Sequence, residues 1–132
     1  MGESSVTVDF NGVVSPEELR RIEQLANEAI YKNLYVETLL PSTEELENYS
    51  YRSKKELQGQ VRLVRIEGVD LCACCGTHVA SSGQVGLVKL LSCQKFRDGV
   101  RLELLCGQRA LDYLSAGWEQ ARQIGQALSV KP

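Results

Sequence analysis

The 132-residue chain lacks several features that would assign it to a large class of proteins. It has no run of about 18 apolar residues, so no membrane span is expected. Residues 1–5 include neither a basic region nor an apolar core, so they do not form a secretory signal. The formal net charge of −2 argues against unselective binding to nucleic acid, although a local basic surface remains compatible with it.

The cysteines do not form the pattern of a disulfide framework. Their number, 5, is odd, and Cys72, Cys74 and Cys75 lie close together, whereas a framework spaces its cysteines along the chain and pairs them. Clustered thiols suit a reducing compartment and metal or thiol chemistry, so we expect a cytoplasmic protein. Cys93 and Cys106 are predicted to be small core residues on strands.

Histidine occurs only once, as His78, and it ends the run Cys74-Cys75-Gly76-Thr77-His78. A thiol and an imidazole four positions apart, across a Gly-Thr turn, can both reach one metal ion. Zinc accepts both ligand types, and a catalytic zinc site uses three protein ligands with one open position. The sequence offers little else to complete such a site.

The first half of the chain alternates strands and helices. Residues 6–10 alternate apolar and polar side chains, which predicts a strand that ends at an Asn-Gly turn. Ser15 begins a capping pattern for a helix that extends to about residue 32. Residues 34–40 are expected to form a second strand, and Ser42 to begin a short helix. Residues 49–60 are polar and are expected to form an exposed linker.

The second half is predicted to contain three strands, at residues 61–66, 87–96 and 100–106. The last two are joined by a tight turn at 97–99, and the cysteine cluster lies on an irregular stretch before them. A long amphipathic helix follows at about 107–130. This order of elements predicts an α+β fold with an antiparallel sheet, helices packed on one face and a long C-terminal helix.

The wider setting of the cysteine–histidine run closely resembles the second half of a known domain. Residues 68–79, then 82–86 and Lys89, are similar to the editing domain, also called the second additional domain, of alanyl-tRNA synthetases and free-standing alanyl-tRNA editing proteins. In that family a Cys-Gly-Gly-Thr-His motif precedes a Thr-Gly-acidic-Ile-Gly segment. Residues 99–103 and 6–10 resemble further family segments, and the resemblance covers about residues 4–114. We take residues 1–114 as a partial editing domain.

The resemblance implies a function. The family hydrolyses the ester of seryl- or glycyl-tRNA(Ala), in which the wrong amino acid is attached, and it uses zinc. Carried over to this chain, Cys74 and His78 are the metal ligands. The two remaining ligands belong to a His-x-x-x-His motif that we expect upstream of residue 1. The implied partner is the acceptor end of tRNA(Ala), and the chain is expected to be a fragment that is inactive alone.

Other site residues follow from the same resemblance. Thr77 is a candidate for a hydrogen bond to the substrate hydroxyl, which would favour serine over alanine. Arg101 is a candidate contact to the tRNA end. Each has a simpler reading, as a turn residue for Thr77 and a solvated strand residue for Arg101. Arg52, Lys54 and Lys55 form either a phosphate-binding patch or a solvated loop.

Two alternatives stay open. The second additional domains of threonyl-tRNA synthetases also carry an Asp-Leu-Cys segment, as at residues 70–72 here, but they usually have Gly-Pro-His in place of Gly-Thr-His. A non-catalytic binding or dimerisation module with a structural zinc is the other alternative. In this sequence Cys75 replaces the family's usual glycine, and Ser82 replaces its usual threonine.

The C-terminal helix carries an apolar stripe that a domain of this size cannot cover fully. Its members recur at three- and four-residue steps or multiples of them: Leu111, Leu114, Trp118, Ala121 and Leu128. We expect this helix to lead to a further segment in the parent protein and to pair two copies of the isolated chain.

Overall fold

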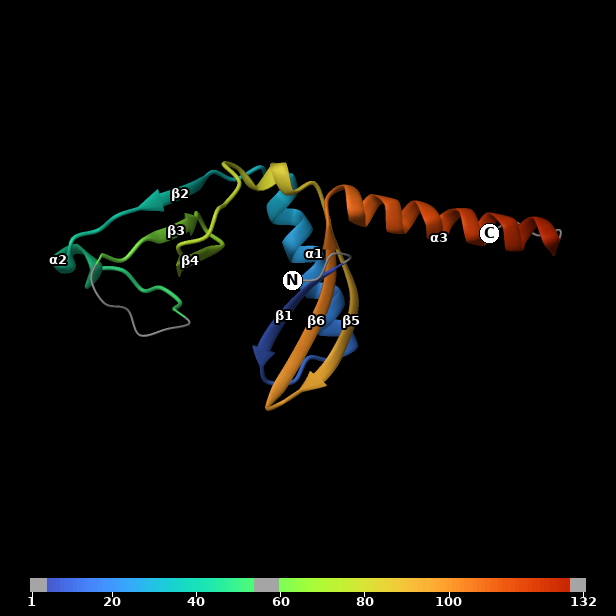
Figure 1. Cartoon of the computed structure of the whole chain (residues 1–132), viewed down its shortest axis with the longest axis horizontal. Helices are drawn as coiled ribbons and strands as arrows, with labels where there is room; N and C mark the ends of the chain where they lie inside the picture. Colours follow the sequence, from blue (N-terminus) through green and yellow to red (C-terminus); the bar gives the residue numbers. More distant parts are fainter. Residues whose placement is uncertain (1–4, 54–59, 129–132) are drawn as a thin grey trace. The chain divides into compact units, whose positions relative to one another are not determined.

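The computed structural model describes residues 5–53 and 60–128, and the chain divides into two compact units. The first unit contains residues 1–27 and 86–132, and the second contains residues 28–85. Figure 1 shows helices together with antiparallel strands in the chain, so the predicted α+β class is confirmed. The strands are divided between two three-stranded sheets, one in each unit.

The sheet of the first unit has the order β1-β6-β5, with both pairs antiparallel. Its strands are β1 (Val6–Asn11), β5 (Val88–Phe96) and β6 (Gly99–Cys106). The predicted hairpin between β5 and β6 is confirmed. Gly99 lies opposite Asn11, and a side chain at Gly99 would collide with the carbonyl group of Phe10, so the turn requires a glycine there.

Alternation along β6 separates a buried face from a polar one. Val100 and Leu102 are buried, and they pair directly with Phe10 and Val8 of β1. Cys93 pairs with Leu102 and is half-buried on β5. Cys106 is half-buried at the end of β6, where burial raises the pKa of its thiol and the charge of Arg109 opposes that rise. Both cysteines therefore lie on strands as predicted, but neither is one of the fully buried core residues, so the expected core position is wrong.

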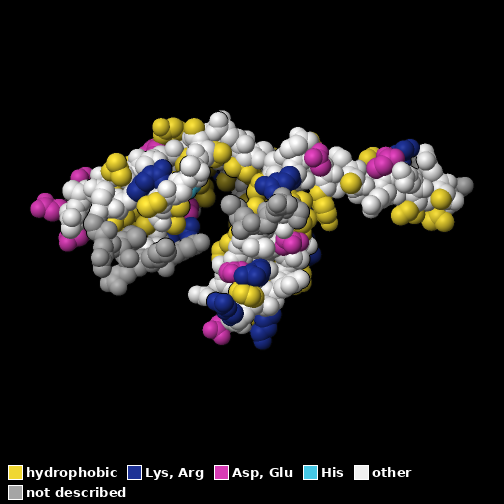
Figure 2. Space-filling model, in the orientation of Figure 1, with side chains coloured by type: hydrophobic (Ala, Val, Ile, Leu, Met, Phe, Trp, Pro, Cys, Tyr) yellow, Lys and Arg dark blue, Asp and Glu magenta, His cyan; other side chains and the backbone are white. Residues whose placement is uncertain are grey.

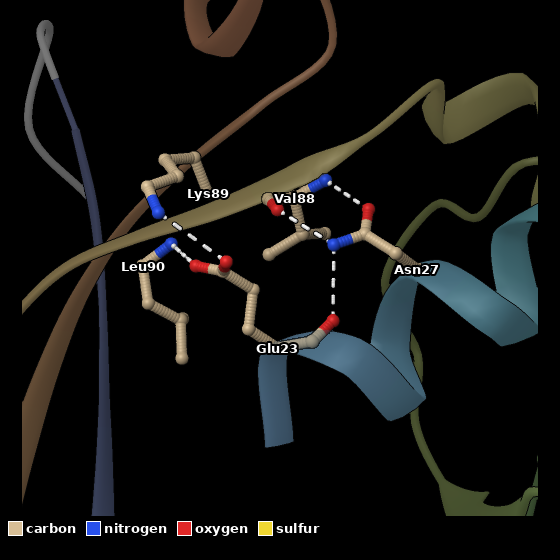
Figure 3. A network of polar contacts seen from close by, with 5 residues as sticks. All are labelled: Glu23, Asn27, Val88, Lys89 and Leu90. Carbon is tan, nitrogen blue, oxygen red and sulfur yellow. Dashed lines mark hydrogen bonds and ion pairs between the residues drawn. The ribbon is translucent and has the colours of Figure 1, made fainter. Parts of the chain in front are cut away.

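Helix α1 (Pro16–Tyr31) begins as its sequence predicts, because Ser15 Oγ accepts a hydrogen bond from the Glu18 N–H at 3.1 Å. Farther along, two of its side chains bind the backbone of β5 (Figure 3). The Asn27 amide donates to the Val88 carbonyl and accepts from the Val88 N–H, both at 2.9 Å. Glu23 accepts from the Leu90 N–H at 2.7 Å. These bonds fix the position of the helix along the strand.

Helix α3 (Gln108–Ala127) is long and largely exposed, as predicted. Leu114 is 41% exposed and Trp118 is 60% exposed, and hydrophobic side chains lie at its surface in Figure 2. The last expected helical residues, 129 and 130, lie outside the described residues. In the part of the chain that the structure describes, no helix has both the length and the apolar character that crossing a bilayer requires.

The second unit contains the sheet β2-β3-β4, again antiparallel. Its strands are β2 (Val36–Leu39), β3 (Leu63–Ile66) and β4 (Asp70–Ala73), and Leu63 and Val64 of β3 are buried. Helix α2 (Thr43–Leu46) has the predicted capping box at Ser42, and a short 3-10 helix, η1, spans Ser82–Val85.

Two expectations for this unit were wrong in part. The start of the cysteine cluster is not irregular, because Asp70–Ala73 forms strand β4 and Cys72 pairs with Val64. Arg52, in the expected linker, pairs its backbone with β4: its N–H donates to the Leu71 carbonyl, and its carbonyl accepts from the Ala73 N–H. Both departures depend on pairing with distant residues, which local sequence patterns do not reveal.

Candidate functional site

The Cys74–His78 segment begins where β4 ends and has no regular secondary structure. Cys74 is half-buried, whereas Cys75, Thr77 and His78 are exposed. The sulfur of Cys74 accepts a hydrogen bond from the Gly76 N–H at 3.4 Å. The segment therefore turns back on itself next to Cys74 and leaves the imidazole and the threonine hydroxyl accessible to solvent.

The simpler interpretation of Thr77, a turn residue whose side chain bonds to its own backbone, is not accompanied by such a bond among the described residues. Within residues 5–53 and 60–128, no hydrogen bond joins its hydroxyl to its own backbone or to a neighbour. An exposed hydroxyl of this kind can still bond to a ligand, so its proposed role stays a prediction.

Arg62 is the residue that binds this segment to the sheet. Its guanidinium Nη1 donates to the Cys74 carbonyl at 3.0 Å and to the Gly76 carbonyl at 2.8 Å. Its own carbonyl accepts from the Cys74 N–H at 3.1 Å, one residue beyond the Leu63–Ala73 pair that ends the β3–β4 ladder. Sequence reasoning assigned no role to this residue, although it placed Arg62 in the predicted strand at residues 61–66; the observed strand β3 begins one residue later.

The described residues do not fit a complete zinc site. Cys74 and His78 have suitable donor atoms, but across the two described stretches no group of three or more His, Cys, Asp or Glu residues is arranged to hold a metal ion. Cys72 lies within β4, and its thiol is directed to the Ala73 carbonyl at 3.5 Å. Among the described residues, the predicted pair Cys74 and His78 therefore has no third donor arranged with it, whereas a catalytic zinc site uses three protein ligands.

Ser82 has a structural role. It is buried, its hydroxyl donates to the Ala29 carbonyl at 2.6 Å, and it accepts from the Leu34 N–H at 2.7 Å. These bonds join η1 to the end of α1 and to the segment before β2. A hydroxyl is needed at this position, which either serine or threonine supplies.

Arg101 lies on β6 of the first unit and contacts side chains of the two neighbouring strands, Asp9 on β1 and Phe96 on β5. It forms a two-point ion pair with Asp9, with donor–acceptor distances of 2.7 and 3.0 Å, and its guanidinium lies 3.7 Å from the centre of the Phe96 ring. The hydrogen bond to Asp9 is the main cause that raises the pKa of Arg101. The side chain is 41% exposed, so it remains accessible to a partner.

The predicted basic patch is only partly described. Arg52 pairs with Asp70 at 2.6 Å, and this hydrogen bond is the main cause that lowers the pKa of Asp70, against the opposing effect of burial. Lys54 and Lys55 lie outside the described residues. A phosphate-binding role for the patch stays a prediction.

Comparison with known proteins identifies the class to which this site belongs. Residues 61–102 match the family described as the threonyl and alanyl tRNA synthetase second additional domain. That stretch contains the whole Cys74–His78 segment, Arg62 and Arg101. The chain therefore carries part of a second additional domain of the aminoacyl-tRNA synthetases, as its motif predicted.

Individual relatives narrow the resemblance to the alanine branch. The chain is 35% identical over 97% of its length to an alanine–tRNA ligase of Korarchaeum cryptofilum, and 38% identical over 90% to one of Pyrococcus abyssi. A Methanopyrus kandleri alanine–tRNA ligase is 33% identical over 98% of the chain. The chain spans about 15% of the length of these relatives.

Proposed function

We propose that this chain is part of an alanyl-tRNA editing protein that hydrolyses the ester of mischarged seryl- or glycyl-tRNA(Ala). The observation that carries the proposal is the Cys74–His78 segment, which lies inside the matched stretch. It presents a half-buried thiol, an exposed hydroxyl and an exposed imidazole within five consecutive residues. The similarity to alanine–tRNA ligases supports the same assignment.

The reaction is a hydrolysis. Water adds to the ester carbonyl carbon, the bond to the ribose oxygen breaks, and the products are the free amino acid and a tRNA with its terminal hydroxyl restored. In this proposal Thr77 bonds to the serine hydroxyl, which alanine lacks. A site that rewards a hydroxyl with a dedicated partner rejects the analogue without it. Arg101 contributes a positive charge to binding of the acceptor end of the tRNA.

We propose that zinc binds in the complete protein and not in this chain alone. Cys74 and His78 would supply two of its ligands, and residues that are not part of this chain would supply the others. When bound, zinc can activate water and stabilise an oxyanion in ester hydrolysis. The described residues alone hold no complete set of ligands, so the isolated chain is expected to have no deacylase activity.

The test is a deacylation assay with the full-length protein that contains this chain. Release of serine from seryl-tRNA(Ala), with little release of alanine from correctly charged alanyl-tRNA(Ala), is the expected result. Thr77→Val, which removes the hydroxyl but keeps the branched shape, should reduce this preference. Equal hydrolysis of both substrates by the unaltered protein, or of neither, would contradict the proposal.

A further inference from the structure

We propose that Arg62 is a positioning residue, which sets the place of the Cys74 and His78 side chains by holding the backbone between β4 and the imidazole. This inference rests on the proposed function, because it concerns the same segment. It adds to the candidate site a residue that contributes no atom to the reaction. Arg62 directly precedes β3, whereas the motif follows the paired strand β4.

The contacts of Arg62 concentrate on one short stretch of chain. Nη1 donates to the carbonyls of Cys74 and Gly76. Nη2 donates to the hydroxyl of Thr38 on β2 at 3.4 Å. The backbone carbonyl of Arg62 accepts from the Cys74 N–H. One residue thus binds Cys74 through both its N–H and its carbonyl.

These bonds replace a ladder that the segment cannot form. Strand β4 ends at Ala73, so Cys74 and Gly76 lie outside the β3–β4 pairing, and the partner that the structure shows for each of their backbone carbonyls is the Arg62 guanidinium. Polar backbone groups require partners, and a planar guanidinium offers several donors in a fixed arrangement. Since a lysine ammonium is a compact point charge without that fork, it reproduces the arrangement poorly.

By holding the backbone of Cys74 and Gly76, Arg62 also affects the surroundings of the Cys74 sulfur. With the carbonyls of Cys74 and Gly76 both held by Nη1, the Gly76 N–H is directed at Cys74 Sγ at 3.4 Å. His78 follows two residues later. Without Arg62, we expect the segment to sample other conformations, and a shift of about 1 Å in a reacting group can cost about 10²-fold in rate.

The first experiment uses the 132-residue chain and needs no assumption about function. Arg62→Gln is compared with Arg65→Gln, which removes an arginine three residues away that bonds to Glu37 on β2 rather than to the motif. We expect Arg62→Gln to change the backbone amide NMR shifts of residues 74–78 and to lower their order parameters, while shifts in the β3 core stay unchanged. Unchanged shifts and order parameters at residues 74–78 would overturn the inference.

The second experiment measures deacylation by the full-length protein. We expect Arg62→Gln to lower kcat about 10- to 100-fold with KM changed less than about twofold, because tRNA binding is kept and only the site is misplaced. Arg65→Gln should stay within about twofold of the unaltered protein, and Arg62→Lys should recover only part of the loss. An unchanged kcat in Arg62→Gln, or full recovery with lysine, would overturn the inference.

The two experiments separate failure of this inference from failure of the proposed function. If the unaltered protein does not deacylate seryl-tRNA(Ala), the proposed function fails, and the NMR comparison still decides whether Arg62 orders the segment. If Arg62→Gln does not fold, Arg62→Lys is measured in its place, and the same change at residues 74–78 is expected at smaller amplitude. Native-like shifts throughout Arg62→Lys, with unaltered kcat, would again overturn the inference.

Discussion

In the first unit Arg101 donates to the carboxylate of Asp9 and lies over the ring of Phe96, whereas in the second unit Arg62 donates to the backbone carbonyls of Cys74 and Gly76. Arg101 itself is paired with Asp9 of β1 and with Gln94 of β5, so the arginine side chain adds contacts between side chains to strands that are already joined. Around Arg62 the ladder has ended. An arginine there supplies the backbone contacts that regular structure does not, and the candidate site depends on it.

The largest expected effect tests whether the chemistry belongs to the second unit. Cys74→Ala in the full-length protein should lower deacylation more than about 10²-fold, because a proposed ligand next to the reacting centre is lost. Cys75→Gly should be tolerated, since Cys75 is exposed and its position carries glycine in the family that the motif resembles. The assay is serine release from seryl-tRNA(Ala). The opposite ranking of the two variants would mean that the motif is aligned one residue out.

Metal binding by the isolated chain tests whether the second unit alone can hold zinc. The second unit offers Cys74 and His78 but no third donor arranged with them among the described residues, so the isolated chain should retain no stoichiometric zinc after mild chelation. Elemental analysis together with thiol titration measures this. Tight one-to-one binding that survives chelation would show that the second unit is complete, and would favour a structural zinc module.

Self-association is expected from the first unit alone. Helix α3 exposes an apolar stripe that includes Leu114 and Trp118, and two-fold pairing is the commonest way to cover such a surface. Light scattering at tens of micromolar should give twice the mass of the chain. Trp118→Glu should give the single mass, and Gln120→Glu, at another exposed position on the helix, should not. A monomer in the unaltered chain would contradict the prediction.

A smaller effect concerns how the first unit is held together. Asn27→Ala removes both hydrogen bonds to Val88, so the backbone N–H and carbonyl of Val88 lose their partner. This should lower the free energy of unfolding by about 2 kcal/mol. Asn48→Ala, at an exposed position, should change it by less than about 0.5 kcal/mol. Urea unfolding of the two variants gives the difference. Equal stability of both would mean that water replaces the amide without cost.

The smallest effect belongs to an exposed ion pair of the second unit. Arg52 lowers the pKa of Asp70 in the folded chain, so the pair stabilises the fold above the carboxyl's ordinary pKa, and this contribution is lost as pH falls through the lowered value. Since the Arg52 side chain is 63% exposed, Asp70→Asn should cost less than about 1 kcal/mol at pH 7. Near pH 2 the variant and the unaltered chain should unfold alike. A cost that persists at pH 2 would assign the effect to packing.

Local signals in the sequence predicted much of this structure. The caps at Ser15 and Ser42 predicted the helix starts, alternation predicted β1, and the turn at 97–99 predicted the hairpin of β5 and β6. The motif itself predicted the family, because Cys74 and His78 lie only four positions apart in the sequence. Strand β4 was missed because its Asp-Leu-Cys-Ala stretch has little strand propensity of its own and becomes a strand by pairing with β3.

The residues that were missed act over long separations. Arg62 reaches the motif only because Leu63 pairs with Ala73, and Asn27 meets Val88 across 61 positions of sequence. No local period or cap signals such contacts, since they depend on the register of strands that only the folded chain defines. The family motif was therefore recognisable in the sequence, whereas these long-range contacts were not.

The bonds from α1 to β5 also bear on how this protein avoids aggregation through an exposed sheet edge. A strand at the border of a sheet presents unpaired N–H and carbonyl groups, which can template the addition of a foreign strand and start aggregation. Asn27 occupies both groups of Val88, and Glu23 occupies the N–H of Leu90. The beginning of β5 is therefore closed to such addition by two side chains, without a fourth strand.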